Sequence, residues 1–346
     1  MAADSMNPAD TRQLGGTDVR LTQMGFGGAS IGELFVNVPE EDAFACLRAA
    51  WDAGIRYFDT APWYGRGLSE LRTGAGLRDR PPGEYVLSTK VGRWLRPPAD
   101  PARFSTAPWT GGLRFEVVFD YSYDGIMRAY EQSQLRLGVT RYDLAIIHDL
   151  DLGYHRPEQR LTAHFAQLAA SGFRALSELK RAGLIRGIGA GINARGLIPR
   201  FLDLFDMDFF LVAMPYTLLH QEVLQDEFPR CVERGVGFVI GAVFSSGILA
   251  TGAAPRAHYN YASAPPEILE RVRRIEAVCV RHNVPLAAAA LQFPLGHPSV
   301  ASVIPGASRP EQVRRNVAAF GQRIPQDLWA ELKTENLLRQ DAPVPS

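Results

Sequence analysis

Eight short apolar runs, separated by longer amphipathic stretches, constrain the fold of this 346-residue chain more than any other feature. Their apolar residues are continuous rather than alternating, which is typical of parallel strands buried on both faces. The expected strands lie at residues 22–26, 57–59, 85–89, 144–148, 185–190, 209–214, 237–242 and 300–304. Strand followed by helix, repeated eight times, predicts an α/β fold: a (β/α)8 TIM barrel with the helices outside.

Amphipathic helix patterns fill most of the gaps between these runs, and several of them stop at a glycine. The expected helices lie at residues 40–53, 121–137, 174–182, 222–234, 267–282 and 310–319. An open doubly wound sheet is the alternative, but it needs a G-x-G-x-x-G loop after its first strand. GFGGAS (25–30) and GIGAG (187–191) both fail to complete that motif, so the barrel is the favoured prediction.

The length allows two domains, but a barrel of this size is often one domain, and we expect residues 1–346 to form one. Two connections are long, at about 91–119 and 149–172. Loops of this length are usually functional or disordered. The aromatic residues in the first connection, Trp94 and Trp109, favour a loop that covers a substrate.

Charge and composition argue against several function classes. The formal net charge is zero, so no basic surface indicates nucleic acid or an anionic membrane as a partner. Cys46, Cys231 and Cys279 lie far apart, which matches neither a disulfide framework nor a zinc site. The amino-terminal residues lack an apolar signal core, and no apolar run has the roughly 18 residues of a membrane helix. We therefore expect a cytoplasmic protein with a small-molecule substrate, present as a monomer or small homo-oligomer.

Four ionisable side chains follow three neighbouring expected strands. Asp59 ends the second strand and Tyr64 lies in the loop after it; Lys90 follows the third strand, and His148 ends the fourth. Each has an ordinary structural explanation by itself: a helix cap, a surface aromatic, a solvated charge and a core histidine. Because the carboxyl ends of barrel strands share one face, where active sites lie, we expect the four side chains to meet there.

This set of side chains suits proton transfer by a phenol. A free tyrosine titrates near pH 10, which is too high for a good base at neutral pH. Lys90 can lower the pKa of Tyr64, and a shift of about three units takes roughly 4 kcal/mol. Asp59 can hold the lysine, and His148 can hydrogen-bond a substrate oxygen. The hypothesis is a site that interconverts a carbonyl and an alcohol, which needs a hydride carrier and implies no metal.

At these positions the sequence resembles the aldo-keto reductase family. The motifs that carry the likeness are GIRYFDTAPWYGRGLSE (54–70), LSTKVGRWLRP (87–97), RYDLAIIHDLD (141–151) and LIRGIGAGIN (184–193). The resemblance extends from MGFGG (24–28) to IPGASRPEQVRRN (304–316). It implies a (β/α)8 barrel that binds a nicotinamide dinucleotide without a Rossmann fold. It also implies that the four residues above are the catalytic tetrad: Asp59, Tyr64, Lys90 and His148.

The resemblance further implies cofactor contacts after the later strands. Asn193 is expected at the nicotinamide carboxamide, where Ala213 replaces the family's usual glutamine, and Tyr216 is expected to stack on the nicotinamide ring. The loop VFSSGILA (243–250) matches the pyrophosphate loop, and residues 306–316 match the adenosine end. The other implied cofactor contacts are Gly28, Phe244, Ser245, Ser246, Gly247, Leu249, Gly306, Ser308, Gln312 and Asn316.

One departure from the family pattern bears on the cofactor. Members that prefer NADPH commonly carry Lys-Ser after the last strand and an arginine five residues after that serine. Here Gly306, Ala307 and Gln312 occupy these positions, and a 2′-phosphate requires Arg or Lys partners. Arg309 remains as a candidate partner. The resemblance therefore predicts NAD in preference to NADP.

Within the family, the sequence looks like the dehydrogenase branch. That branch includes D-threo-aldose 1-dehydrogenase (L-fucose or L-galactose dehydrogenase) and pyridoxal 4-dehydrogenase. The resemblance implies oxidation of a cyclic hemiacetal, such as a sugar to its lactone, with Tyr64 as the base. Pyridoxal forms a hemiacetal with the same reacting group, so the site residues do not choose between the sugar and pyridoxal. The side chains expected to contact the substrate are Trp63, Trp94, Trp109, Phe119 and Asp149.

Two rival interpretations stay open at this point. A reductase that acts on aldehydes with NADPH would share the tetrad, so cofactor preference and direction of turnover discriminate between them. A non-catalytic barrel is the other rival, since family members also serve as channel subunits and crystallin-like proteins. The intact tetrad argues against it.

Overall fold

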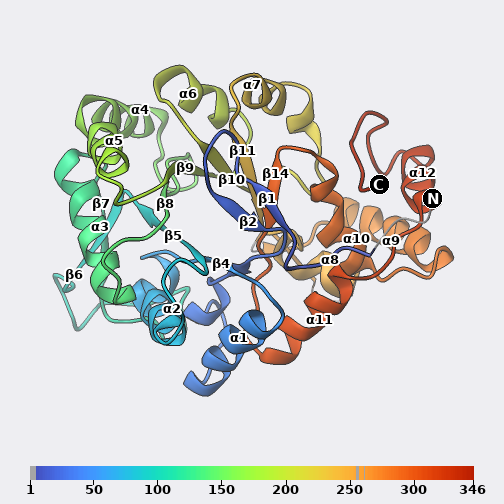
Figure 1. The fold of residues 1–346 in the computed structure, drawn as a ribbon, viewed down its shortest axis with the longest axis horizontal. Helices are drawn as coiled ribbons and strands as arrows, with labels where there is room; N and C mark the ends of the chain where they lie inside the picture. Colours follow the sequence, from blue (N-terminus) through green and yellow to red (C-terminus); the bar gives the residue numbers. More distant parts are fainter. Residues whose placement is uncertain (1–4, 255–256, 261) are drawn as a thin grey trace.

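Within residues 5–254, 257–260 and 262–346, which the computed structural model describes, an eight-stranded parallel sheet forms the centre of the molecule (Figure 1). Its strands adjoin one another in chain order: β3 (Phe26–Gly27), β4 (Tyr57–Asp59), β5 (Val86–Val91), β8 (Leu144–Ile147), β9 (Gly187–Ile192), β10 (Phe209–Ala213), β11 (Gly237–Gly241) and β14 (Val300–Val303). Parallel backbone bridges, Met24 to Val303 and Gly27 to Gly306, join the two edges. The sheet therefore closes, and the predicted (β/α)8 barrel is confirmed.

A hairpin that the sequence pattern did not predict covers the amino-terminal end of the barrel. It pairs two antiparallel strands, β1 (Thr11–Gln13) and β2 (Arg20–Thr22). Leu21 is fully buried and packs in the same core cluster as Tyr57 from the barrel. The expected strand at 22–26 was wrong, because it merges the end of β2 with the start of β3. The sequence pattern did not reveal the short break after Thr22 that separates the two strands.

Helices surround the strands on the outside of the barrel (Figure 1). They are α1 (Glu40–Asp52), α2 (Leu68–Leu77), α3 (Tyr123–Leu137), α4 (Glu158–Gln167), α5 (Phe173–Arg181), α6 (Leu197–Leu204), α7 (Glu227–Glu233), α8 (Ile248–Thr251), α9 (Pro266–Arg281), α10 (Leu286–Gln292), α11 (Pro310–Phe320) and α12 (Gln326–Thr334). Five expected helices are confirmed within two residues at each end. The sixth, 222–234, is shorter, because the 3-10 turn η4 (Glu222–Leu224) precedes α7.

Local signals explain why α3 is recovered from the sequence while α2 is not. Ser122 caps α3 by accepting a hydrogen bond from the Gly125 N–H, and Gly138 ends the helix with a φ of 66°, a conformation that glycine adopts readily. Helix α2 has no continuous apolar stripe in its sequence, because the side chains that it buries include the polar Glu70 and Arg72. Its amphipathic pattern is therefore weak.

The two long connections contain regular structure, which corrects their interpretation as loops. In the first, β6 (Arg93–Arg96) and β7 (Glu116–Phe119) pair as an antiparallel hairpin. In the second, α4 occupies residues 158–167 and a π-helical turn joins it to α5. The pairing of β6 with β7 was hidden because proline, glycine and polar residues separate the two strands.

Arg66 holds the tip of the first connection against the barrel. Its buried guanidinium donates hydrogen bonds to the carbonyl oxygens of Ser105, Thr106, Ala107 and Phe115, at 3.3, 3.4, 3.4 and 3.0 Å. One side chain thus donates to four carbonyls of an irregular segment, and the Thr106 carbonyl also accepts from the Trp109 N–H. None of the helices within the described residues is long and apolar enough to cross a lipid bilayer.

Candidate active site

The carboxyl ends of β4 and β5 bring a buried lysine and aspartate together. Lys90 Nζ donates to Asp59 Oδ2 at 2.7 Å and to the Thr60 carbonyl oxygen at 2.8 Å. The other carboxylate oxygen of Asp59 accepts from Ser88 Oγ at 2.7 Å. Parallel register places Asp59 beside Ser88, and Lys90, two residues further on, points to the same face. Strand geometry therefore builds this contact directly.

The ion pair is enclosed, since the Asp59 and Lys90 side chains are each 2% exposed. Buried charges are tolerated when they are paired and hydrogen-bonded, and both conditions hold here. Lys90 Nζ also lies 4.6 Å from the centre of the Tyr64 ring. Tyr64 begins the 3-10 turn η2 (Tyr64–Gly67) that follows β4. The lysine thus links the carboxylate to the phenol.

His148 completes the group at the end of β8. Its backbone N–H donates to the Val91 carbonyl oxygen at 3.0 Å, and its ring centre lies 5.9 Å from that of Tyr64. Burial lowers the pKa of the imidazole well below its usual range, and the nearby Arg93 and Lys90 cations lower it further. The imidazole is therefore neutral near pH 7. The structure brings together all four residues of the expected tetrad.

The free energy of unfolding should fall as the pH drops from 7 to 5, because buried histidines remain neutral in the fold. Burial lowers the pKa of both His155 and His297 to about 4, whereas an unfolded histidine titrates near pH 6.5. Below that value the unfolded chain binds more protons, so stability is lost as the pH falls. Each histidine should account for about 2 kcal/mol of the loss.

Urea denaturation at both pH values measures this loss. His155→Gln should remove one histidine's share, so its stability should fall by about 2 kcal/mol less than that of the wild type over the same interval. Equal losses in the two proteins would contradict the assignment of a neutral buried His155.

A second charged cluster adjoins the tetrad, and the sequence interpretation named its Asp149 and Asn193 but not Arg93. Arg93 on β6 forms a buried ion pair with Asp149, and Asp149 Oδ2 lies 3.3 Å from His148 Nε2. Asn193 donates from Nδ2 to Asp149 Oδ1 at 2.7 Å and to Asp151 Oδ2 at 2.8 Å. Burial raises the pKa of Asp149, while Arg93 and the Asn193 hydrogen bond oppose that rise. Arg93 gave no signal because the β6–β7 hairpin was not predicted.

The expected substrate aromatics divide into three groups. Trp109 is buried, with its ring centre 5.8 Å from that of Tyr64 and 5.6 Å from that of Trp63. Phe119 lies against Arg93 instead, 4.7 Å from its guanidinium carbon. Trp94 packs under Arg128 of α3, and alternation along β6 places it on the face opposite Arg93. The structure does not bring Trp94 to the tetrad.

The loop after β11 has the features of a site for an anionic group. Ser245, Ser246 and Gly247 follow one another with φ values of 46°, 63° and 101°, so the backbone is left-handed over three residues. The N–H groups of Ser245 and Gly247 already bond to carbonyls within the loop. The Ser245 hydroxyl is buried without a hydrogen-bond partner among the described residues. This hydroxyl fits an oxygen of a dinucleotide, and Phe244 beside it is partly exposed.

The segment after β14 contains the four residues expected near adenosine. Gly306 is exposed at the bridge that closes the barrel. The Gln312 Oε1 atom accepts from the backbone N–H groups of Ser308 and Arg309, at 2.8 and 3.2 Å. Gln312 thus caps the start of α11, and Asn316 lies one helical turn further on. The side-chain oxygen of Gln312 is therefore already occupied by hydrogen bonds at the start of the helix.

Three of the expected cofactor residues are packing positions in this structure. Tyr216 is fully buried among Phe228, Phe293 and His297, so no face of its ring is open for stacking. Leu249 is also fully buried. A Cβ atom on Gly28 would approach the Asp59 carbonyl oxygen to 2.7 Å, so this glycine permits the strand end that carries Asp59. An aromatic that follows a strand can face the site or the core, and the sequence does not distinguish these outcomes.

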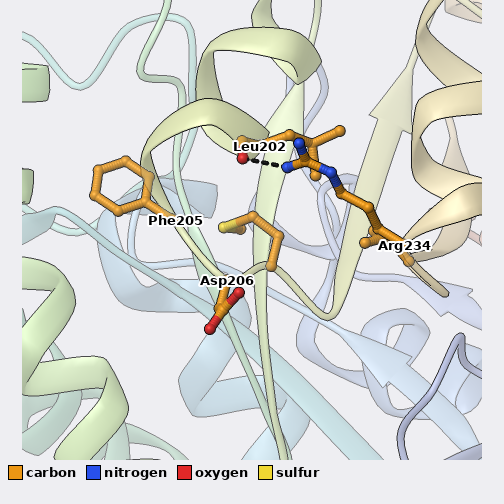
Figure 2. A pocket seen from close by; sticks show the side chains of 6 residues that line it. Leu202, Phe205, Asp206 and Arg234 are labelled. Atoms are coloured by element: carbon orange, nitrogen blue, oxygen red, sulfur yellow. Dashed lines mark hydrogen bonds between the residues drawn. The ribbon is translucent and has the colours of Figure 1, made fainter.

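A pocket of about 340 Å³ lies elsewhere, lined by residues that precede β10 and β11, including Leu202, Phe205, Asp206 and Arg234 (Figure 2). Arg234 donates to the Leu202 carbonyl oxygen there. The tetrad residues follow strands, whereas these residues precede them, so the pocket is at the opposite end of the barrel.

No group of three or more His, Cys, Asp or Glu side chains suited to a metal ion occurs within the described part of the chain.

Comparison with known proteins agrees with this geometry. The model of the aldo/keto reductase family matches residues 23–336. Pyridoxal 4-dehydrogenase of Microbacterium luteolum is 42% identical over 342 residues, covering 96% of this chain and 99% of that protein. D-threo-aldose 1-dehydrogenase of a Pseudomonas species is 42% identical over 324 residues, covering 91% and 94%. The solved structure of an aldo-keto reductase from Bacillus halodurans in its holo form matches with a TM-score of 0.70 at 24% identity, over 96% of this chain and 97% of that one.

Proposed function

The chain belongs to the aldo/keto reductase family, and on that premise we propose that it oxidises a cyclic hemiacetal to a lactone with a nicotinamide dinucleotide. It is an oxidoreductase that acts on CH–OH donors, as the names of its relatives indicate. A sugar and pyridoxal both form cyclic hemiacetals, which present a ring carbon that bears OH and H. The observation that carries the proposal is the convergence of Lys90, Asp59, Tyr64 and His148 at one end of the barrel.

Tyr64 is the proposed general base. It takes the proton from the hemiacetal hydroxyl, and the Lys90 ammonium, 4.6 Å from the centre of the phenol ring, stabilises the negative charge that the phenol oxygen carries before it accepts the proton. Asp59 keeps that ammonium in place. His148, neutral because of its depressed pKa, binds the reacting oxygen. A nicotinamide ring bound at this site would supply the hydride acceptor for the hydrogen on the same carbon.

Residues after the later strands would hold the dinucleotide. Both hydrogens of the Asn193 Nδ2 atom are engaged by Asp149 and Asp151, so its Oδ1 atom is the proposed acceptor for the carboxamide N–H. The unpartnered Ser245 hydroxyl is the proposed pyrophosphate contact, and Asn316 is the proposed contact for the adenosine. The burial of Tyr216 makes partly exposed Phe244 the better candidate for contact with the nicotinamide ring.

We expect Gln312→Arg to raise kcat/KM for NADP by about tenfold or more, since a charge-assisted hydrogen bond to the 2′-phosphate is worth roughly 1.5–3 kcal/mol. The wild type should prefer NAD, because Gly306, Ala307 and Gln312 offer no cation there. Initial rates with each cofactor at saturating substrate measure the preference. Gln312→Met, which loses the helix cap without adding charge, is the control. A wild type that strongly prefers NADP would refute the NAD assignment.

Initial rates of NADH and NADPH formation with L-fucose, D-arabinose, L-galactose and pyridoxal test the function itself. Oxidation of an aldose with NAD supports the sugar dehydrogenase assignment. Oxidation of pyridoxal alone would change the proposed substrate to pyridoxal. The pyridoxal 4-dehydrogenase that matches this chain over 99% of its own length supports that alternative. Reduction of simple aldehydes by NADPH, with no oxidation of any hemiacetal, would replace the proposal by the reductase alternative.

A further inference from the structure

We propose that Asp149, positioned by Arg93, binds the hydroxyl on the substrate atom next to the reacting carbon, and that the pair thereby selects aldoses with a hydroxyl at carbon 2. This inference rests on the proposed oxidation of a hemiacetal and names its substrate class. Asp149 would touch the substrate, whereas Arg93 would act through Asp149 as a positioning residue.

The carboxylate of Asp149 is fixed beside the atom that would bind the reacting oxygen. Its Oδ2 atom lies 3.3 Å from His148 Nε2 and is also paired with Arg93. Its Oδ1 atom accepts from Asn193 at 2.7 Å. A substrate oxygen held by His148 therefore places the neighbouring ring substituent next to Asp149. A carboxylate has about four lone-pair sites, so it can still accept one more hydrogen bond.

Within the described part of the chain, Asp149 is the carboxylate that pairs with Arg93. Its side chain is 1% exposed, and its guanidinium carbon lies 4.5, 4.7 and 5.4 Å from the ring centres of Tyr154, Phe119 and Trp63. Its Nε atom is buried without a hydrogen-bond partner among the described residues. A cation enclosed in this way needs a counter-charge, and Asp149 supplies it. The aromatic rings prevent the guanidinium from turning to water, so the direction of Asp149 is fixed.

The backbone of Asp149 supports a functional role for this arrangement. Its φ is 46°, in the left-handed region that non-glycine residues rarely occupy. Such a conformation persists where surrounding contacts enforce it, and these positions cluster at ligand-binding and catalytic sites. Here the contacts to Arg93 and Asn193 enforce it. The strain aims the carboxylate toward His148 rather than toward solvent.

The chemistry of the pair favours a sugar. A sugar hydroxyl at carbon 2 donates its hydrogen to the carboxylate, giving a charge-assisted bond. In pyridoxal the atom next to the reacting carbon is a ring carbon without a hydroxyl, and the phenolic hydroxyl one atom further on would, in its ionised form, be repelled by Asp149. Of the two hemiacetals that the relatives' names suggest, the aldose is therefore the one that forms a favourable contact with the Asp149 carboxylate.

The test compares kcat/KM for L-fucose and D-arabinose with the values for their 2-deoxy counterparts, using NAD. In the wild type we expect the 2-deoxy sugars to be poorer by about tenfold or more, because they cannot donate the charge-assisted hydrogen bond to Asp149. Arg93→Gln should bring this ratio toward one, mainly through a higher KM for the parent sugar. Arg93→Lys, which preserves the charge, should retain part of the ratio.

Asp149→Asn keeps the shape of the side chain and decides the question if Arg93→Gln does not fold, as judged by thermal unfolding. Arg128→Gln, an exposed cation on α3, is the matched control and should leave the ratio unchanged. A wild-type ratio near one, an unchanged ratio in folded Asp149→Asn, or faster oxidation of pyridoxal than of any aldose would overturn the inference alone. Absence of NAD- or NADP-linked oxidation of every hemiacetal would overturn the proposed function and this inference with it.

Discussion

Tyr64→Phe should lower kcat for hemiacetal oxidation by roughly 10²- to 10⁴-fold, the usual contribution of a positioned general base. The substitution removes one oxygen atom and leaves the ring that packs against Trp109 and His148. Cofactor affinity and the midpoint of thermal unfolding should therefore change little. Stopped-flow measurement of NADH formation separates the chemical step from product release and gives the effect on that step directly.

Tyr123→Phe is the matched control for this substitution. Its hydroxyl donates to Glu178 at 2.7 Å on the outer helices, so the same atom is lost far from the tetrad, and kcat should stay at the wild-type value. If Tyr64→Phe kept more than about a tenth of the wild-type kcat, a base other than Tyr64 would have to remove the proton.

Lys90→Met should reduce both stability and activity. The change leaves Asp59, 2% exposed, as a buried charge without its partner, which typically costs about 3–5 kcal/mol. Activity should fall as well, because the ammonium beside Tyr64 is gone. Urea denaturation at pH 7 gives the free energy of unfolding, and initial rates give the activity.

The double variant Asp59→Asn/Lys90→Met separates the two effects. Removing both charges should recover part of the lost stability, since no buried charge remains unpaired. Activity should remain low, because the phenol still lacks its cation. Recovery of activity together with stability would contradict the role assigned to Lys90 and would make the pair purely structural.

Most of the strands that build the barrel were visible in the sequence because they are buried on both faces and so consist largely of apolar residues. β3 was misplaced because it consists of only two residues, Phe26 and Gly27. A strand this short does not stand out from the residues before it. The hairpin of β1 and β2 was missed because its polar residues give no alternating pattern. Helix α2 escaped notice because Glu70 and Arg72 face the interior.

The residues of the site also divide into those that a sequence pattern places and those that it does not. Asp59, Lys90 and His148 could be expected near one another because strand ends share one rim of a barrel. The direction of a side chain within a loop has no such rule. Arg93 was missed because its orientation depends on the β6–β7 pairing across 19 intervening residues, and Tyr216 was assigned to the cofactor although it lies in the core. Contacts that depend on long-range loop packing are not encoded in local periodicity.

Arg66, which ties residues 105–107 and Phe115 to the barrel through four carbonyl oxygens, affects how substrates are admitted. A segment that is already ordered loses little conformational entropy when a ligand binds beneath it. Trp109, which the sequence predicts as a substrate contact and which this segment carries, would then act as a rigid wall rather than as a closing lid. Differences in affinity between substrates will therefore reflect the groups that each one presents to the wall, with little contribution from reorganisation of the protein.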